Sequence, residues 1–240
     1  MRGQPTPEPS LVTLTVWGVG GRHVPGALLA MATGRRHLHR PGGPRFAKLL
    51  GTGHGRTFTV RDADPRHWAL LATWDDAAHA DAFERGPLHR GWDRRAHERL
   101  DVRLTPIASR GRWSRREPFG DPRPAAPPPV GERVAAVTRA RIRPRRAATF
   151  WRAVPAVSAD LNAGPGLLLA LGIGEAPIGL QGTFSLWRSA ADLVEFAHRR
   201  APHQEAVRRT PRENWYAEEL FARFAVLSVR GSFAGRTVDA

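Results

Sequence analysis

The chain has 240 residues, of which 41% are hydrophobic and 25% charged, and it contains no cysteine. This is ordinary for one large or two small globular domains, and the missing cysteine excludes disulfides, iron–sulfur clusters, thiolate-ligated haem and cysteine nucleophiles. The net charge is +15, and Lys48 is the only lysine among 37 basic residues. GC-rich codons explain much of this arginine content. Affinity for an acidic or anionic partner is the other interpretation.

The sequence carries no targeting or membrane-spanning signal. No apolar run approaches the roughly 18 residues that span a bilayer, and residues 1–10 are polar and rich in proline, unlike a signal peptide. We therefore expect a cytoplasmic protein.

A proline-rich stretch over residues 114–131 divides the chain. It holds six prolines and two glycines, and such a stretch forms neither a helix nor a central strand. We predict an N-terminal unit over residues 1–113, a linker over 114–131 and a C-terminal unit over 132–240.

The two units share features in the same order, which indicates an internal duplication. The matches are LGTG (50–53) with LGIG (171–174), Trp74 and Phe83 with Trp187 and Phe196, Pro87 and His89 with Pro202 and His203, and RGRW (110–113) with RGSF (230–233). We expect the two LGxG motifs to form turns at strand ends that need positive φ.

Hydrophobic patterning predicts the order strand, helix, strand, strand, helix, strand in each unit. Predicted strands cover residues 11–17, 57–60, 68–73, 100–109, 133–142, 166–171, 180–187 and 225–230. Predicted helices cover residues 26–33, 76–85, 147–161, a segment capped by Ser189, and a segment from Pro211 through Phe224. The fold class is α+β: two tandem ferredoxin-like repeats whose antiparallel sheets pair as an intrachain dimeric α/β barrel, with a cleft between sheet and helices in each half.

Candidate site residues lie in the C-terminal unit. His203 follows Pro202 at a predicted helix break, where an imidazole facing an apolar cleft can ligate haem iron, although a lone histidine at a helix end is ordinarily structural. Further along, Glu219 and Arg223 would form an i, i+4 ion pair on a helix, with Trp215 on the same side. Both a packed amphipathic helix and an aromatic pocket wall, with an arginine for a carboxylate, fit this segment.

Many short segments resemble the spheroidene monooxygenase family of acyclic carotenoid ketolases. They include FAKLLGTG (46–53), WALLATWD (68–75), RGRWS (110–114), TRA (138–140), FW (150–151), GIGEAP (172–177), TFSLW (183–187), His203, Trp215, EEL (218–220) and FARF (221–224). The resemblance covers residues 11–233. It implies an oxygen-dependent monooxygenase that hydroxylates one activated carbon twice, so that a gem-diol collapses to a ketone.

The resemblance also implies a cofactor and partners. Haem would be held by His203 as iron ligand, with Trp215 and Arg223 as further cofactor-binding residues, and Arg223 and Glu219 would be catalytic. Phe184 and Trp187 are candidate cleft aromatics. The substrate would be an apolar small molecule, most simply a carotenoid, with O₂ as co-substrate and an acidic ferredoxin as electron donor. A monomer is expected because the duplication supplies both halves of the barrel, and peripheral membrane contact stays open.

Two other functions stay open. One is a cofactor-free monooxygenase of the antibiotic-biosynthesis type, acting on an electron-rich polyketide that activates O₂ itself. The other is a basic module that binds nucleic acid, against which the scattered aromatic residues and the missing RNP-type motif argue.

Overall fold

The computed structural model describes residues 9–54, 62–122, 131–175, 180–199 and 208–238, apart from 209 and 211. The first repeat contains β1 (Leu11–Val19), α1 (Val24–Leu38), β2 (Phe46–Gly53), β3 (Ala63–Trp74), α2 (Ala77–Glu84), α3 (Pro87–Asp93) and β4 (Ala96–Gly111). The second repeat contains β5 (Val134–Ile142), α4 (Ala147–Asn162), β6 (Leu167–Gly174), β7 (Leu180–Trp187), α5 (Ala190–Arg199), β8 (Tyr216–Phe233) and β9 (Arg236–Thr237).

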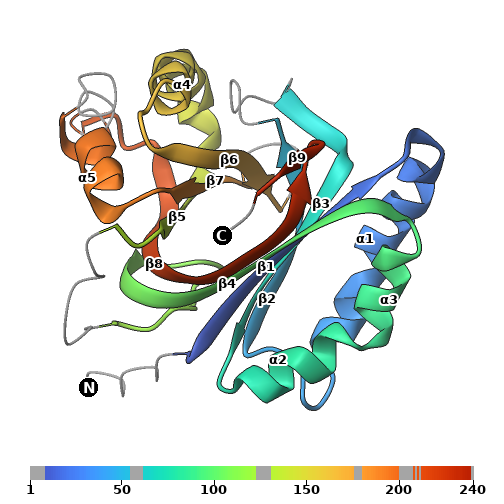
Figure 1. Ribbon diagram of the computed structural model, residues 1–240. Coiled ribbons are helices and arrows are strands. Elements are labelled where there is room, and N and C mark those ends of the chain that lie inside the picture. The colour runs from blue at the N-terminus through green and yellow to red at the C-terminus, as the bar shows by residue number, and fades with distance from the viewer. Residues whose placement is uncertain are drawn as a thin grey trace, which may run out of the picture.

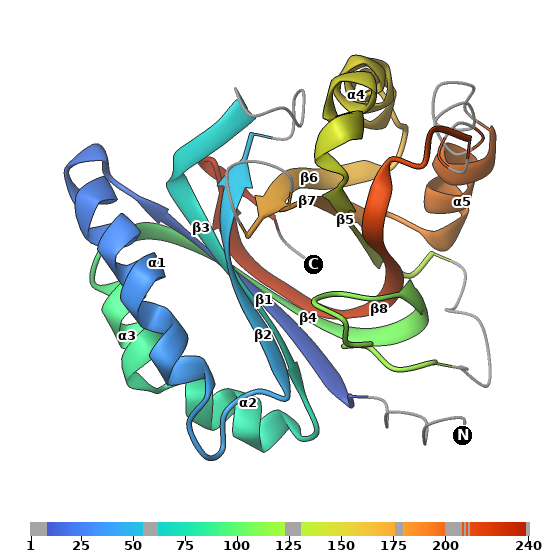
Figure 2. The same ribbon diagram turned by 180° about the vertical axis from the view of Figure 1, so that it is seen from behind.

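The two repeats form one closed antiparallel barrel. The strand order is β4-β1-β3-β2-β6-β7-β5-β8, and pairing of β4 with β8 closes the ring. Helices α1–α3 cover the outside of the first sheet, and α4 and α5 stand outside the second (Figures 1 and 2). The predicted fold class is therefore confirmed.

The barrel interior is filled with apolar side chains. Alternate residues of every strand point inward, and the inward set includes Val12, Leu14 and Val16 of β1 and Leu220, Ala222 and Phe224 of β8, all buried. This alternation is the period-2 pattern of strands with one face in a core. Any ligand site must consequently lie outside the barrel or at its ends.

The glycine motifs differ from the prediction. They lie inside β2 and β6 and pair with each other: Gly51 faces Gly174, and Gly53 faces Gly172. None of these glycines has positive φ, so the predicted turns are wrong, because long-range strand pairing at the junction of the repeats overrides the local turn preference. The strand expected over residues 57–60 lies outside the described residues, and β2 precedes it.

The helix predicted from Pro211 through Phe224 is wrong from Tyr216 onward, although residues 212–213 are helical. Residues from Tyr216 onward form β8, which pairs with both β5 and β4. Glu219 and Arg223 therefore lie about 13 Å apart along a strand, on the same face, and the expected i, i+4 ion pair does not form.

The same structural motif closes both ends of the barrel: a glycine with positive φ, an aromatic core residue and a tight turn. Gly111 and Gly231 have φ of +89° and +99°, and each is followed by an aromatic residue of the barrel core, Trp113 or Phe233. A tight turn with positive φ comes next in each case, at residues 114–115 and 234–235.

Each turn binds a glutamate of the other repeat. The backbone amides of Ser114 and Arg115 donate to Glu218 at 2.9 and 2.7 Å, and the amide of Gly235 donates to Glu98 at 3.1 Å. Glu98 and Glu218 are 120 residues apart, as are Gly111 and Gly231. The repeats are thus braced to each other reciprocally at both ends.

We expect Gly111→Ala to lower the free energy of unfolding by about 3 kcal/mol, because a Cβ there would lie 2.2 Å from the carbonyl oxygen of Glu219 at a positive φ. Gly131→Ala is the matched control, since Gly131 has the same φ of +89° with open space around it, and about 1 kcal/mol is expected. Urea unfolding of both variants measures the difference. Equal losses would refute the close approach.

The barrel end that contains Phe233 is expected to contribute less to the free energy of unfolding as pH rises. His67 lies between two carboxylates, with Nδ1 2.6 Å from Asp64 and Nε2 2.8 Å from Glu98. Burial lowers the pKa of His67, but the hydrogen bonds and charges of Asp64 and Glu98 outweigh it, so this pKa is raised above 6.5. The stabilisation is present below pH 6.5 and is lost as pH rises through the raised pKa.

We expect His67→Gln to remove that pH dependence and to be less stable than the wild type at pH 6. The exposed His79 gives the control, since His79→Gln should keep the wild-type slope. Unfolding free energies measured between pH 6 and pH 9 test this, and a wild-type slope in His67→Gln would contradict it.

Candidate functional site

The outer face of the first sheet is filled by large side chains. Trp17 of β1, Trp68 and Leu70 of β3 and Leu49 of β2 are buried beneath α1 and α3. Trp17 stacks on Trp92 of α3 with ring centroids 5.4 Å apart. The cleft expected between sheet and helices in this half is therefore replaced by core.

Strand pairing identifies the matching positions of the second sheet. In the first sheet, Trp17 pairs with Trp68 and with Arg99. In the second, Ala140 pairs with Gln181 and with Glu219. The sequence offsets agree with this correspondence. Gln181 follows Trp68 by 113 residues, as Trp187 follows Trp74. Glu219 follows Arg99 by 120 residues, as Gly231 follows Gly111.

Small residues replace the large ones in the second sheet. Ala140 stands where the first sheet has Trp17, and Gln181 where it has Trp68. In the next row, Thr183 and Gly172 stand where the first sheet has Leu70 and Leu49. We call this surface the open face and define it by Thr138, Ala140, Gly172, Gln181, Thr183 and Phe221, none of which is buried.

The open face lies between two packed ends. On one side Trp187 packs with Leu161, Leu193 and Phe196 beneath α4 and α5. On the other, Trp215 is buried against α4, where its Nε1 donates to Oγ1 of Thr149 at 3.1 Å. The described side chains of α4 and α5 therefore pack on the sheet at its two ends, and the residues of the open face between them are partly buried or exposed.

The predicted site residues fall in different places. Glu219 and Arg223 lie on β8 at the margin of the open face, and Trp215 forms one packed end. Phe184 lies inside the barrel and Trp187 in the core beneath α4 and α5, so neither lines a cleft. His203 lies outside the described residues.

Arg223 differs from its counterpart in the first repeat. Arg103, 120 residues earlier on β4, is bonded to Asp81 and to Glu84 of α2. No described acidic side chain pairs with Arg223, which is exposed. The side chain is available to an anionic group on the open face.

His89, the counterpart proposed for His203, is a core residue. It is 2% exposed, between the rings of Trp17 and Phe83. Burial lowers the pKa of His89 to about 4, so the ring is neutral. The first repeat thus has a histidine at the position that corresponds to His203, but its ring is buried in the core.

An ion network at the Trp113 end went unnoticed in the sequence. Glu175 accepts hydrogen bonds from Lys48 at 2.5 Å, from Arg139 at 2.8 Å and from Trp113 at 2.7 Å, and Arg139 also pairs with Glu218. Burial raises the pKa of Glu175, but Lys48, Trp113 and Arg139 outweigh it and hold this pKa low. Through this contact Lys48 links the first repeat to the second. In the sequence, the one feature that could have drawn attention to this network is that Lys48 is the only lysine.

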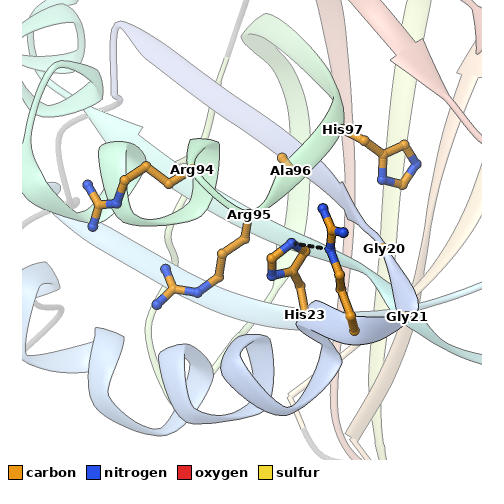
Figure 3. A pocket seen from close by; sticks show the side chains of 8 residues that line it. Gly20, Gly21, His23, Arg94, Arg95, Ala96 and His97 are labelled. Carbon is orange, nitrogen blue, oxygen red and sulfur yellow. Dashed lines mark hydrogen bonds between the residues drawn. The ribbon is translucent and has the colours of Figure 1, made fainter.

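An open pocket between the segment that joins β1 to α1 and the start of β4 is a weaker candidate. It is lined by Gly20, Gly21, Arg22, His23, Arg94, Arg95, Ala96 and His97. In Figure 3 Arg94 and Arg95 point to one side and His97 to the other. Ligand sites gather polar groups that converge, and these diverge.

Two negative findings concern the described part of the chain. Its histidine, aspartate and glutamate side chains form no cluster of three that could hold a metal ion. Among its helices, none has the length and apolar character that crossing a membrane requires.

The fold and its one-sided open face define a class: an α/β barrel with both halves fused in one chain. No family model matches the sequence. Two solved aldoxime dehydratases share the fold, with TM-scores of 0.59 and 0.57 at 13% identity. The alignments cover 90% of this chain and 79% of the first, and 94% of this chain and 88% of the second.

Relatives in sequence place the chain more closely. It is 37% identical over 218 residues to spheroidene monooxygenase of Rhodobacter capsulatus, covering 90% of each chain. It is 38% identical over 222 residues to that of Rubrivivax gelatinosus, covering 92% of this chain and 80% of the relative. The chain belongs to the spheroidene monooxygenase family, and it is a monooxygenase.

We expect the double variant Ala140→Trp, Gly172→Leu to lose at least tenfold in monooxygenase turnover, or about 1.4 kcal/mol, because it restores first-repeat bulk to the open face. Its unfolding free energy should stay within about 1 kcal/mol of wild type, since the positions are not buried. Leu227→Trp, at an exposed position elsewhere on β8, is the control. Undiminished turnover in the double variant would rule out the open face as the site.

Proposed function

We propose that this protein is a haem-dependent monooxygenase that oxidises a carotenoid with O₂ on the open face of the second repeat. The observation that carries the proposal is the similarity along nine-tenths of the chain to enzymes named for spheroidene, a carotenoid. The open face supports it, because a long apolar substrate needs an uncovered, largely uncharged surface, and the first half offers none.

The residues present fit a haem group. Haem brings four nitrogen ligands of its own and requires an axial side chain rather than a cluster of three. The small residues Ala140, Gly172 and Thr183 add little side-chain bulk to the open face, which suits a flat ring, and Arg223, which pairs with no described acidic side chain, suits a propionate. We propose that His203 would hold the haem iron, since the chain has no cysteine for a thiolate.

When bound, haem would supply the activation of O₂ that inserts oxygen into a C–H bond. The chain's own residues would do the remaining work. Phe221 and the small residues of the open face would bind the flat apolar ring and exclude water from the site where the substrate is oxidised. Glu219, which lies beside Ala140 on the same face, would carry protons on its carboxylate oxygens between solvent and the site.

The electron donor we propose is an acidic ferredoxin. The chain carries a net charge of +15, and Arg223 at the margin of the open face is exposed. Charge complementarity of this kind accelerates docking between proteins.

We expect wild-type protein from haem-supplemented cells to show a Soret band of about one haem per chain that shifts with dithionite and carbon monoxide. His203→Ala should lose it, whereas His79→Ala, at an exposed position of α2, should keep it. Retention of stoichiometric haem in His203→Ala would remove His203 as the ligand.

The same preparation separates the haem mechanism from its alternative. With a carotenoid substrate and ¹⁸O₂, the labelled atom should appear in the product. Turnover by colourless protein would favour a cofactor-free monooxygenase, and no turnover by haem-loaded protein with a suitable reductant would contradict the proposed substrate class.

A further inference from the structure

A second arginine lies beside Arg223. In the β4–β8 ladder, Ala108 pairs with Arg223 and Arg110 pairs with Phe221. Phe221 and Arg223 alternate with the buried Leu220, Ala222 and Phe224, so both point outward, as does Arg110 across from them. Arg110 and Arg223 are therefore diagonal neighbours, within reach of one another's ligands.

Arg110 is held in place by an aromatic ring rather than by a described acidic side chain. Its guanidinium carbon lies 4.7 Å from the centroid of the Phe221 ring, a cation–π contact. A guanidinium that stacks by its flat face keeps the N–H groups at its edge free to bind an anion in the same plane. No described acidic side chain forms an ion pair with Arg110, which is exposed.

The first repeat shows what ordinarily happens on such a face. There Arg103 is neutralised by Asp81 and Glu84 of α2. In the second repeat, by the 113-residue offset that relates Trp74 to Trp187, the uncharged Val194 and Ala197 of α5 stand where Asp81 and Glu84 stand in α2. Arg110 and Arg223 thus point outward on the same face without an ion pair to any described carboxylate, whereas the first repeat supplies two carboxylates to Arg103.

We infer that Arg110 and Arg223 together bind two carboxylates on one edge of a flat, largely apolar ligand. The ligand class is a tetrapyrrole, with the arginines taking its paired propionates and Phe221, Thr138 and Thr183 beneath its ring. Glu219 lies on the same face beyond Phe221 and keeps the anionic edge on the side of Arg223. The inference rests on the proposed function and adds Arg110 as a cofactor-binding residue.

The experiment uses iron-free protoporphyrin IX and its dimethyl ester, so that axial ligation plays no part. Binding to the full chain is followed by quenching of tryptophan fluorescence. The wild type should bind the diacid at least tenfold more tightly than the ester. Arg110→Ala and Arg223→Ala should each weaken diacid binding about tenfold and leave ester binding unchanged, since each removes a charge-assisted hydrogen bond.

Two further variants sharpen the test. Arg110→Lys keeps the charge but loses the stacked fork, so it should restore only part of the affinity. Arg230→Ala is the matched control. Arg230 corresponds to Arg110, 120 residues later in the chain, but it lies at the other end of β8, where it pairs with Asp101 of the first repeat. The Arg230→Ala variant should therefore bind both porphyrins as the wild type does. Unchanged ester binding shows that each variant is folded.

Three results would overturn the inference: equal affinity of the wild type for diacid and ester, no binding of either, or wild-type affinity in Arg110→Ala. These outcomes are independent of carotenoid turnover. Turnover without porphyrin discrimination would refute the arginine pair and leave the substrate assignment standing. Tighter binding of the diacid than of the ester, without carotenoid turnover, would support the arginine pair and contradict the substrate assignment.

Discussion

The structure depends on the need to pair the edges of two small sheets. A four-stranded sheet with helices on one face leaves its other face apolar and two edges with unpaired backbone groups. Pairing β2 with β6 and β4 with β8 satisfies all four edges and encloses both apolar faces in one interior. The glycines of the first junction and the braced turns at the barrel ends all serve this closure.

Much of the fold follows from local patterns. The bounds of β7 agree with the predicted 180–187, and the hydroxyl of Ser189 accepts from the amide of Asp192 as a helix cap should. The first half of β8 was missed, although residues 225–230 were predicted as a strand, because proline and i, i+4 charges favour a helix locally, whereas pairing with two neighbouring strands decides the conformation. The LGxG motifs were misread for the same reason: each motif's partner is 121 residues away.

The candidate site divides in a similar way. Sequence reasoning found Glu219 and Arg223, because charged and aromatic residues gather there, but placed them on the wrong element. It expected a cleft in each half, and it had no means of telling that only the second half has an open face or of finding Arg110 there. Both depend on which rows of the two sheets correspond, and only strand pairing supplies that. For the ion network around Glu175, the only indication in the sequence was that the chain has a single lysine, Lys48.

Fusion of the repeats has an evolutionary consequence. In a barrel assembled from two identical chains, every substitution enters both halves, so opening one outer face also empties the other and stability falls twice. A single chain removes that symmetry. The tryptophan-rich first half can hold a reserve of folding free energy, while the second half accepts substitutions that reshape a binding surface. Such a protein can change its substrate with little risk to its fold.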